Sequence, residues 1–128
     1  FGLDPRQPEA LKNREVDNMI SLHVYMNPKA DKDRELEAGI RDKWMAAMSE
    51  QPGFLRAVLL KPFPDDELDK LQAAKPTSTF ETVAFWRSEE ERQAWAARPI
   101  HDQVFNPLLE LADDVSYTLQ TVERDWNL

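Results

Sequence analysis

The sequence predicts an α+β domain in which helices cover one face of a four-stranded antiparallel sheet. Three observations lead to this fold class. Four short segments carry the alternating or β-branched patterns of strands. Two longer segments repeat apolar residues every three or four positions, as amphipathic helices do. The segments follow one another as strand, helix, strand, strand, helix, strand, and 128 residues suffice for one such domain.

The first strand is expected at residues 18–26, where NMISLHVYM alternates with a period of two. Its apolar face consists of Ile20, Leu22, Val24 and Met26. Its second face consists of Ser21, His23 and Tyr25. These side chains are polar but uncharged, whereas a face in contact with water more often carries Lys or Glu. The second face is therefore expected to line an interior cavity.

A long helix is expected to begin at Asp31 or Asp33 and to run to about Glu50, before a Pro-Gly pair. Its apolar stripe comprises Leu36, Ile40, Trp44, Met45 and Met48. Residues 54–62, FLRAVLLKP, then form a second strand that is apolar on both faces. The connection 62–78 contains three prolines and an acidic cluster, and DDELDKLQAA can form a helical turn or two. A connection of this length is either a lid or a solvated excursion of the hairpin.

The third strand is expected at residues 79–86, TFETVAFW. Ser88 and Glu91 stand at capping-box spacing, and glutamates in a first turn suit the helix dipole, so a helix begins after Ser88. A second helical piece, HDQVFNPLLELA, follows, and its Pro107 either kinks it or opens a new first turn. The last strand is expected at residues 114–124, with Val115, Tyr117 and Leu119 on one face.

This order of elements is the split-βαβ, ferredoxin-like plan, βαββαβ. Its helices leave one face of the sheet open, and the second strand is too apolar to face water on either side. A symmetric homodimer that closes sheet against sheet is the expected solution. We divide the chain into an N-terminal arm, residues 1–17, and one domain, residues 18–128.

Composition excludes several classes of function. A net charge of −8 disfavours nucleic acid and anionic membranes as partners. The absence of cysteine removes disulfides, thiolate nucleophiles and Cys-type zinc sites, and is compatible with a cytoplasmic protein. Two histidines 78 positions apart show no metal-ligand spacing, and three glycines form no phosphate-binding loop. We therefore expect neither a metal nor a cofactor.

Three consecutive motifs resemble one known family. PGFLRAVLLKP, FWRSEEERQAW and PIHDQVFNPLL, in this order and spacing, resemble the antibiotic biosynthesis monooxygenase family of dimeric α+β barrels, from about Met19 to Val122. The resemblance implies a dimeric barrel with a pocket between sheet and helices. It also implies one of several activities: cofactor-free oxygenation of aromatic polyketides or quinols, haem degradation, processing of signalling molecules, or none known.

Both histidines are candidate catalytic residues. An imidazole titrates near ~6.5, so it can act as a general base at neutral pH. His101 opens a helical piece, where the helix dipole disfavours the imidazolium, and is the preferred base for removing a phenolic proton. His23 can orient a substrate oxygen or be the base itself. The structural alternative for each is a histidine that caps a helix or bonds a strand neighbour.

Aromatic residues are the candidate substrate-binding residues, in a pocket for a small, flat, apolar molecule. The predicted binding residues are Tyr25, Trp86, Trp95 and Phe105. Tyr25 can donate a hydrogen bond to a carbonyl, and the other rings can stack on a flat substrate. Packing in the core is the alternative interpretation for each of them. Together with both histidines, these side chains are expected to converge.

Two other functions remain open at this stage. One is a non-catalytic ligand-binding or stress-response dimer. The other is haem binding, although His23 replaces the asparagine that haem-degrading relatives carry on the first strand, and His101 follows Trp95 by only six residues. Some polyketide-oxidising relatives carry an asparagine shortly before the tryptophan that ends the third strand, whereas here Thr82 stands four residues before Trp86.

Overall fold

The computed structural model describes residues 17–126 of the chain, so all but the last residue of the predicted N-terminal arm lies outside the described residues. The elements are β1 (Ile20–Pro28), α2 (Asp33–Gly39), the π-helix η1 (Ile40–Trp44), α3 (Met45–Met48), β2 (Phe54–Leu60), α4 (Asp65–Leu71), β3 (Phe80–Trp86), α5 (Glu89–Ala96), α6 (Pro99–Leu111) and β4 (Ala112–Thr121).

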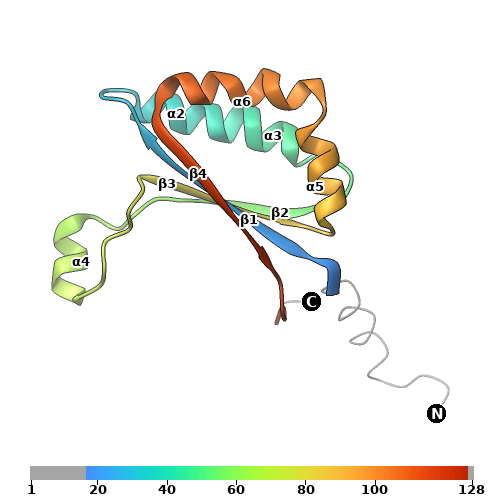
Figure 1. Cartoon of the computed structure of the whole chain (residues 1–128). Coiled ribbons are helices and arrows are strands. Elements are labelled where there is room, and N and C mark those ends of the chain that lie inside the picture. Colours follow the sequence, from blue (N-terminus) through green and yellow to red (C-terminus); the bar gives the residue numbers. More distant parts are fainter. Residues whose placement is uncertain (1–16, 127–128) are drawn as a thin grey trace, which may run out of the picture.

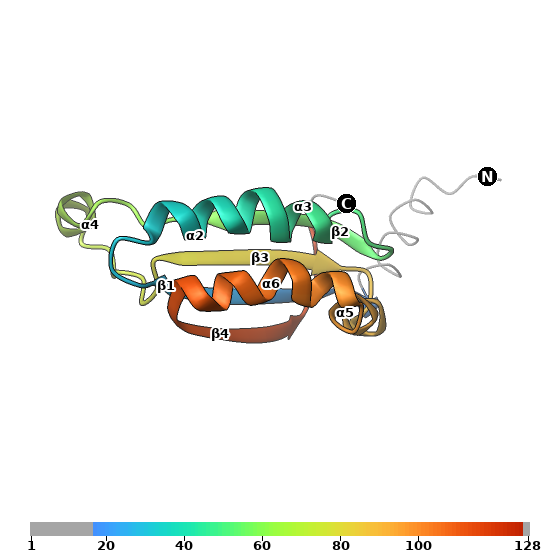
Figure 2. The ribbon, with the colours of Figure 1, turned by 90° about the horizontal axis from the view of Figure 1, so that it is seen from above.

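The four strands form one antiparallel sheet in the order β2-β3-β1-β4. This order confirms the predicted ferredoxin-like fold. The helices α2, α3, α5 and α6 cover one face of the sheet, and no helix of the described chain covers the other face (Figure 1). Seen from above, α6 and the α2–α3 segment lie side by side over the strands, with α5 at one end (Figure 2).

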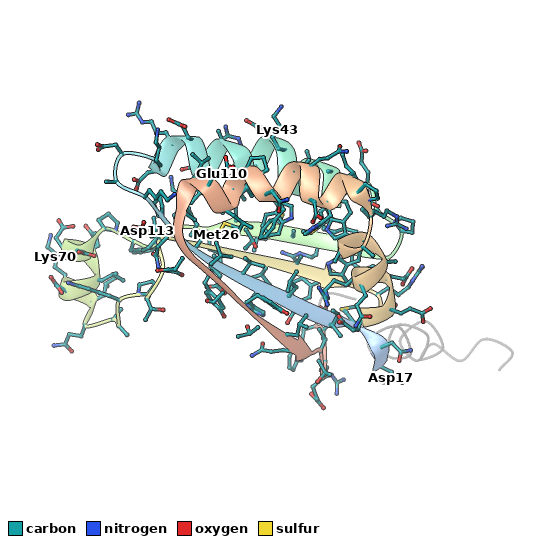
Figure 3. The ribbon with its side chains drawn as sticks, turned by 45° about the horizontal axis from the view of Figure 1, so that its top comes forward. Asp17, Met26, Lys43, Lys70, Glu110 and Asp113 are labelled. Atoms are coloured by element: carbon teal, nitrogen blue, oxygen red, sulfur yellow. The ribbon has the colours of Figure 1, made fainter. Side chains whose placement is uncertain are left out.

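The core fills the space between this helical layer and the sheet (Figure 3). Its largest fully buried side chains include Trp44, Trp86, Trp95, Met26, Leu36 and Leu108. Within the helical layer, α2 and α6 approach closely at Gly39, where an added Cβ would lie 2.5 Å from Leu108 Cδ2. A side chain at position 39 would therefore force the Leu108 side chain to shift.

The first helical segment differs from the uniform α-helix that its apolar stripe predicts. Between Ile40 and Trp44 the backbone forms a π-helix, which adds a residue to the turn and changes the direction of the side chains that follow. Trp44, at its end, is turned inward and is only 2% exposed. A stripe of apolar residues cannot distinguish this arrangement from a regular helix, because both bury the same residues.

The connection between β2 and β3 contains a short helix of seven residues, in agreement with the one or two helical turns that its sequence allows. α4 begins with three acidic residues and ends at Gln72, whose φ of 56° is left-handed. Leu68 is its buried side chain, whereas Leu71 is 62% exposed. The helix projects from one end of the sheet toward the open-face side, and Lys70 marks it in Figure 3 (Figures 1 and 3).

The last helix also differs from its prediction. α6 begins at Pro99, earlier than His101, and it continues through Pro107 without a break to Leu111. Pro99 occupies the first turn, where the missing N–H costs nothing. His101 therefore lies inside the first turn of α6 rather than before it, and β4 follows directly at Ala112.

Candidate functional site

A cavity of about 340 Å³ lies between the helices and the β1–β4 half of the sheet. Its sheet wall consists of Leu22, Val24 and Val115, and its helical wall of Trp44, Ala96, Phe105 and Leu109. Its polar lining consists of Arg92, His101 and Tyr117. Mostly apolar walls with a few polar groups, at a volume near the lower end of known ligand pockets, are typical of a small-molecule site.

His101 is held firmly at this cavity. Its backbone N–H donates to the carbonyl of Arg98 at 3.0 Å, and its side chain is only 17% exposed. The ring stacks on Phe105 with centroids 5.2 Å apart and meets the edge of Trp95 at 5.1 Å. Nδ1 lies 3.4 Å from an Asp102 carboxylate oxygen, at the limit of a hydrogen bond. The imidazole is thus oriented by packing, and Nε2 has no hydrogen-bond partner among the described residues.

Arg92 provides a fixed positive charge at the same cavity. Nε and Nη2 donate to the two carboxylate oxygens of Glu89 at 2.6 and 2.7 Å, a bidentate pair one helical turn apart. These hydrogen bonds raise the pKa of Arg92 and lower the pKa of Glu89. Tyr117, on β4, lines the same cavity as Arg92.

The structure does not bring His23 and Tyr25 to this cavity. Side chains of directly paired residues share a face, and His23 pairs with Val83 and Thr118, next to the Leu22 row that faces the helices. His23 and Tyr25 therefore point to the open face, on the far side of the sheet from His101. The expected convergence of all the candidate residues is not found, because alternate residues of one strand face opposite sides.

A hydrogen-bonded network surrounds His23 on the open face. Its Nε2 lies 3.0 Å from Ser21 Oγ and its Nδ1 lies 3.1 Å from Glu81 Oε2. Tyr25 stacks on the His23 ring and bonds Thr118 Oγ1 at 3.3 Å. The order carboxylate, imidazole, hydroxyl resembles a nucleophilic triad, but both sides of β1 are paired in the sheet, so its backbone offers no oxyanion donors.

Of the four predicted aromatic binding residues, only Phe105 lines the cavity. Trp86 is fully buried and packs edge to face on Phe54, with centroids 5.7 Å apart. Trp95 is 1% exposed and contacts the ring of His101. The core alternative therefore describes the position of these two tryptophans, and Trp95 supports the imidazole from behind.

Several cavity residues were not among the predicted site residues, and three of them carry polar groups: Arg92, Tyr117 and Trp44. The three-residue spacing of Glu89 and Arg92 predicts their ion pair. It does not indicate that the Arg92 guanidinium faces a cavity. Tyr117 lies on the same strand face as Val115, and the apolar Val115 indicates that this face points toward the helices. Trp44 belongs to a stripe that predicts core packing, and only the tertiary arrangement shows that it also borders empty space.

The described residues contain no group of three or more His, Asp or Glu side chains arranged to hold a metal ion. No helix within residues 17–126 combines the length and the apolar composition needed to cross a membrane. The projecting α4 contributes nothing to the lining of the cavity beside His101. The site is thus formed by one apolar cavity, one imidazole, one guanidinium and one phenol.

Comparison with known families identifies the class of protein. The family model described as antibiotic biosynthesis monooxygenase matches residues 19–106. The chain therefore belongs to the antibiotic biosynthesis monooxygenase family. No curated protein matches its sequence.

Solved structures with the same fold span different chemistries. SnoaB from Streptomyces nogalater, a cofactor-independent oxygenase, is similar with a TM-score of 0.66 and 17% identity, over 85% of this chain and 97% of SnoaB. A hydroxynitrile lyase from Passiflora edulis has a TM-score of 0.68 and 7% identity, over 86% and 98%. A dimeric ferredoxin-like protein of unknown function from Bacteroides fragilis has a TM-score of 0.63 and 9% identity, over 80% and 95%. At these identities the likeness supports the fold and not a reaction.

Proposed function

We propose that the protein is a cofactor-independent monooxygenase that acts on a small, flat, apolar substrate of the quinol or polyketide type. The observation that carries this proposal is the apolar cavity with a packed imidazole at its wall. Membership of the antibiotic biosynthesis monooxygenase family and the likeness to SnoaB support it at the level of reaction class.

In the proposed reaction His101 removes the phenolic proton of the bound substrate. The resulting anion is electron-rich and reacts with O₂ at the ring carbon opposite the oxygen. One oxygen atom becomes a carbonyl oxygen on that carbon in place of its hydrogen, and the second leaves as water with that hydrogen and the phenolic proton. The substrate supplies all four electrons. Arg92 and Tyr117 stabilise the anion, one by charge and the other by hydrogen bonding.

Oxygen uptake over a panel of polycyclic phenols and quinols tests this proposal. We expect substrate-dependent uptake in the parent and a loss of about 10²–10⁴-fold in His101→Ala, the usual contribution of a general base. His23→Ala is the matched control, since the other histidine lies on the far side of the sheet. Uptake that survives in His101→Ala, or that is lost equally in His23→Ala, contradicts the assigned base.

We also propose that a second copy covers the open face. That face carries an apolar group on β2 and β3, namely Val58, Leu60, Val83 and Phe85. Leu60 is 45% exposed, and Arg56 lies over the Phe85 ring at 5.8 Å. An apolar patch on the one face of the sheet that the helices leave open indicates an interaction surface. Structural relatives described as dimeric support the proposal.

The second candidate function is a non-catalytic binding dimer, which the same cavity supports. It differs from the first in one outcome. A ligand that binds in the cavity while no panel compound supports oxygen uptake favours binding without catalysis. No observation on the described residues specifically supports haem binding.

A further inference from the structure

The connection between β2 and β3 forms a second cavity, separate from the one described above. It measures about 290 Å³ and lies where α4 folds over the ends of these two strands. Leu60 and Glu81 line it from the sheet, and Phe63 and Leu68 line it from the connection. Glu81 pairs with both Leu60 and Tyr25, so these side chains share the open face of the sheet. The cavity therefore lies on the open-face side of the molecule.

The α4 segment, residues 61–79, is anchored at both of its ends by side-chain hydrogen bonds. At its start Lys61 Nζ donates to Glu37 Oε1 on α2 at 3.2 Å. At its end the Thr79 N–H donates to Asn27 Oδ1 on β1 at 2.9 Å. Between these anchors, α4 makes no extensive contact with any other helix or strand of the described chain. The helix is therefore an anchored projection that stands away from the core (Figure 1).

The projection leaves apolar surface that the fold of one chain does not cover. Leu68 is the buried side chain of α4, whereas Phe63 is 61% exposed and Leu60 is 45% exposed at the cavity. Ordering a connection of this length costs conformational entropy, and the burial of one leucine offsets only a small part of it. Further burial is expected from a second surface that packs against the cavity.

We propose that the α4 segment packs against the second copy of the chain, and that the cavity beneath α4 receives an apolar side chain of that copy. Continuity selects this occupant, because Leu60 belongs both to the cavity and to the apolar group of β2 and β3 that the second copy is proposed to cover. In a symmetric dimer the contact forms twice. The inference rests on the proposed dimer and does not depend on the oxygenase chemistry.

Subunit exchange between dimers tests the contact. Unlabelled and ¹⁵N-labelled protein are mixed, and the formation of mixed dimers is followed by native mass spectrometry. We expect Phe63→Ala to accelerate exchange at least about tenfold, because symmetry removes the aromatic contact twice and such losses act mainly on dissociation. Leu71→Ala is the matched control and keeps the parent rate, since Leu71 is 62% exposed on the same segment but does not line the cavity.

Amide hydrogen exchange tests the same contact with the α4 segment unaltered. The N–H groups of Leu68 and Ala73 donate to carbonyls within the segment at 3.1 and 3.0 Å, so their exchange reports the opening of α4. We expect both to exchange several-fold more slowly in the parent dimer than in Val58→Glu, in which the charge on the open face separates the two copies.

The outcomes separate the α4 contact from the dimer itself. Equal subunit exchange in Phe63→Ala and Leu71→Ala, or equal amide exchange of α4 in dimer and monomer, overturns the inference and leaves the sheet-to-sheet dimer standing. A monomeric parent, or a Val58→Glu variant that stays dimeric, removes the proposed dimer interface and the α4 contact with it. Neither result changes the oxygenase proposal, which oxygen uptake tests separately.

Discussion

The close approach of Gly39 and Leu108 predicts a change of sign between two genetic backgrounds. Alanine at position 39 gains about 1 kcal/mol of helix propensity over glycine. In the parent its Cβ would lie 2.5 Å from Leu108 Cδ2, and such overpacking costs about 1–3 kcal/mol. Gly39→Ala is therefore expected to be neutral or to lower the free energy of unfolding by up to about 2 kcal/mol.

Removing the neighbour changes the result. Leu108 is 1% exposed, so Leu108→Ala alone should cost about 2–5 kcal/mol through lost burial and the cavity left behind. In that background the added methyl group meets no clash, and Gly39→Ala should stabilise by about 1 kcal/mol. The coupling between the two positions is then about 1–3 kcal/mol, well above the additivity error of distant sites.

The cycle is measured by urea unfolding followed by tryptophan fluorescence, at one fixed protein concentration because dimerisation would affect stability. The m-values of the four proteins should agree, so that shifts of the midpoint report stability. An equal stabilisation by Gly39→Ala in both backgrounds would refute the close approach of α2 and α6.

Three further predictions concern the helix start, the pH dependence and the open face. Ser88 Oγ accepts from the Glu91 N–H at 3.2 Å, so Ser88→Ala should cost about 1 kcal/mol in urea unfolding, whereas Ser49→Ala, which caps no helix start, should cost less. Arg92 holds the pKa of Glu89 below its ordinary 4.5, so the pair stabilises the fold above that pH and loses its effect as pH falls through the folded value. Glu89→Gln should thus destabilise at pH 7 and approach the parent in acid, and a constant difference at both pH values would contradict the pair. Val58→Glu should lower the dimer fraction in size exclusion with light scattering, while Leu71→Glu on α4 should not; a parent that is monomeric at micromolar concentration would contradict the proposed interface.

The fold was accessible from the sequence because its determinants are local. The alternation at residues 18–26, the capping pair Ser88 and Glu91, and the apolar stripe of the first helix each define an element by themselves. Boundaries were less accurate, since α6 begins at Pro99 and continues through Pro107. A proline in a helix interior predicts a break in the helix unless contacts with the rest of the fold stabilise the helix around it. Those contacts form only in the tertiary structure.

The candidate site was predicted only in part. His101 and Phe105 border the cavity as expected, but Trp86 and Trp95 are packed in the core. The separation of His23 and Tyr25 from the cavity has a definite cause. An uncharged polar face of a strand can line a cavity or pack against a second sheet. The pattern of one strand does not distinguish these two environments.

The sequence by itself determined the order of elements, the helix start after Ser88 and the residues available for chemistry, because period, capping and composition act over a few neighbours. The tertiary structure alone decided which of those residues meet. Register places His23 and His101 on opposite sides of one sheet, and a π-turn brings Trp44 beside the cavity. Both depend on how distant segments pack, and packing is a property that no short stretch of residues contains.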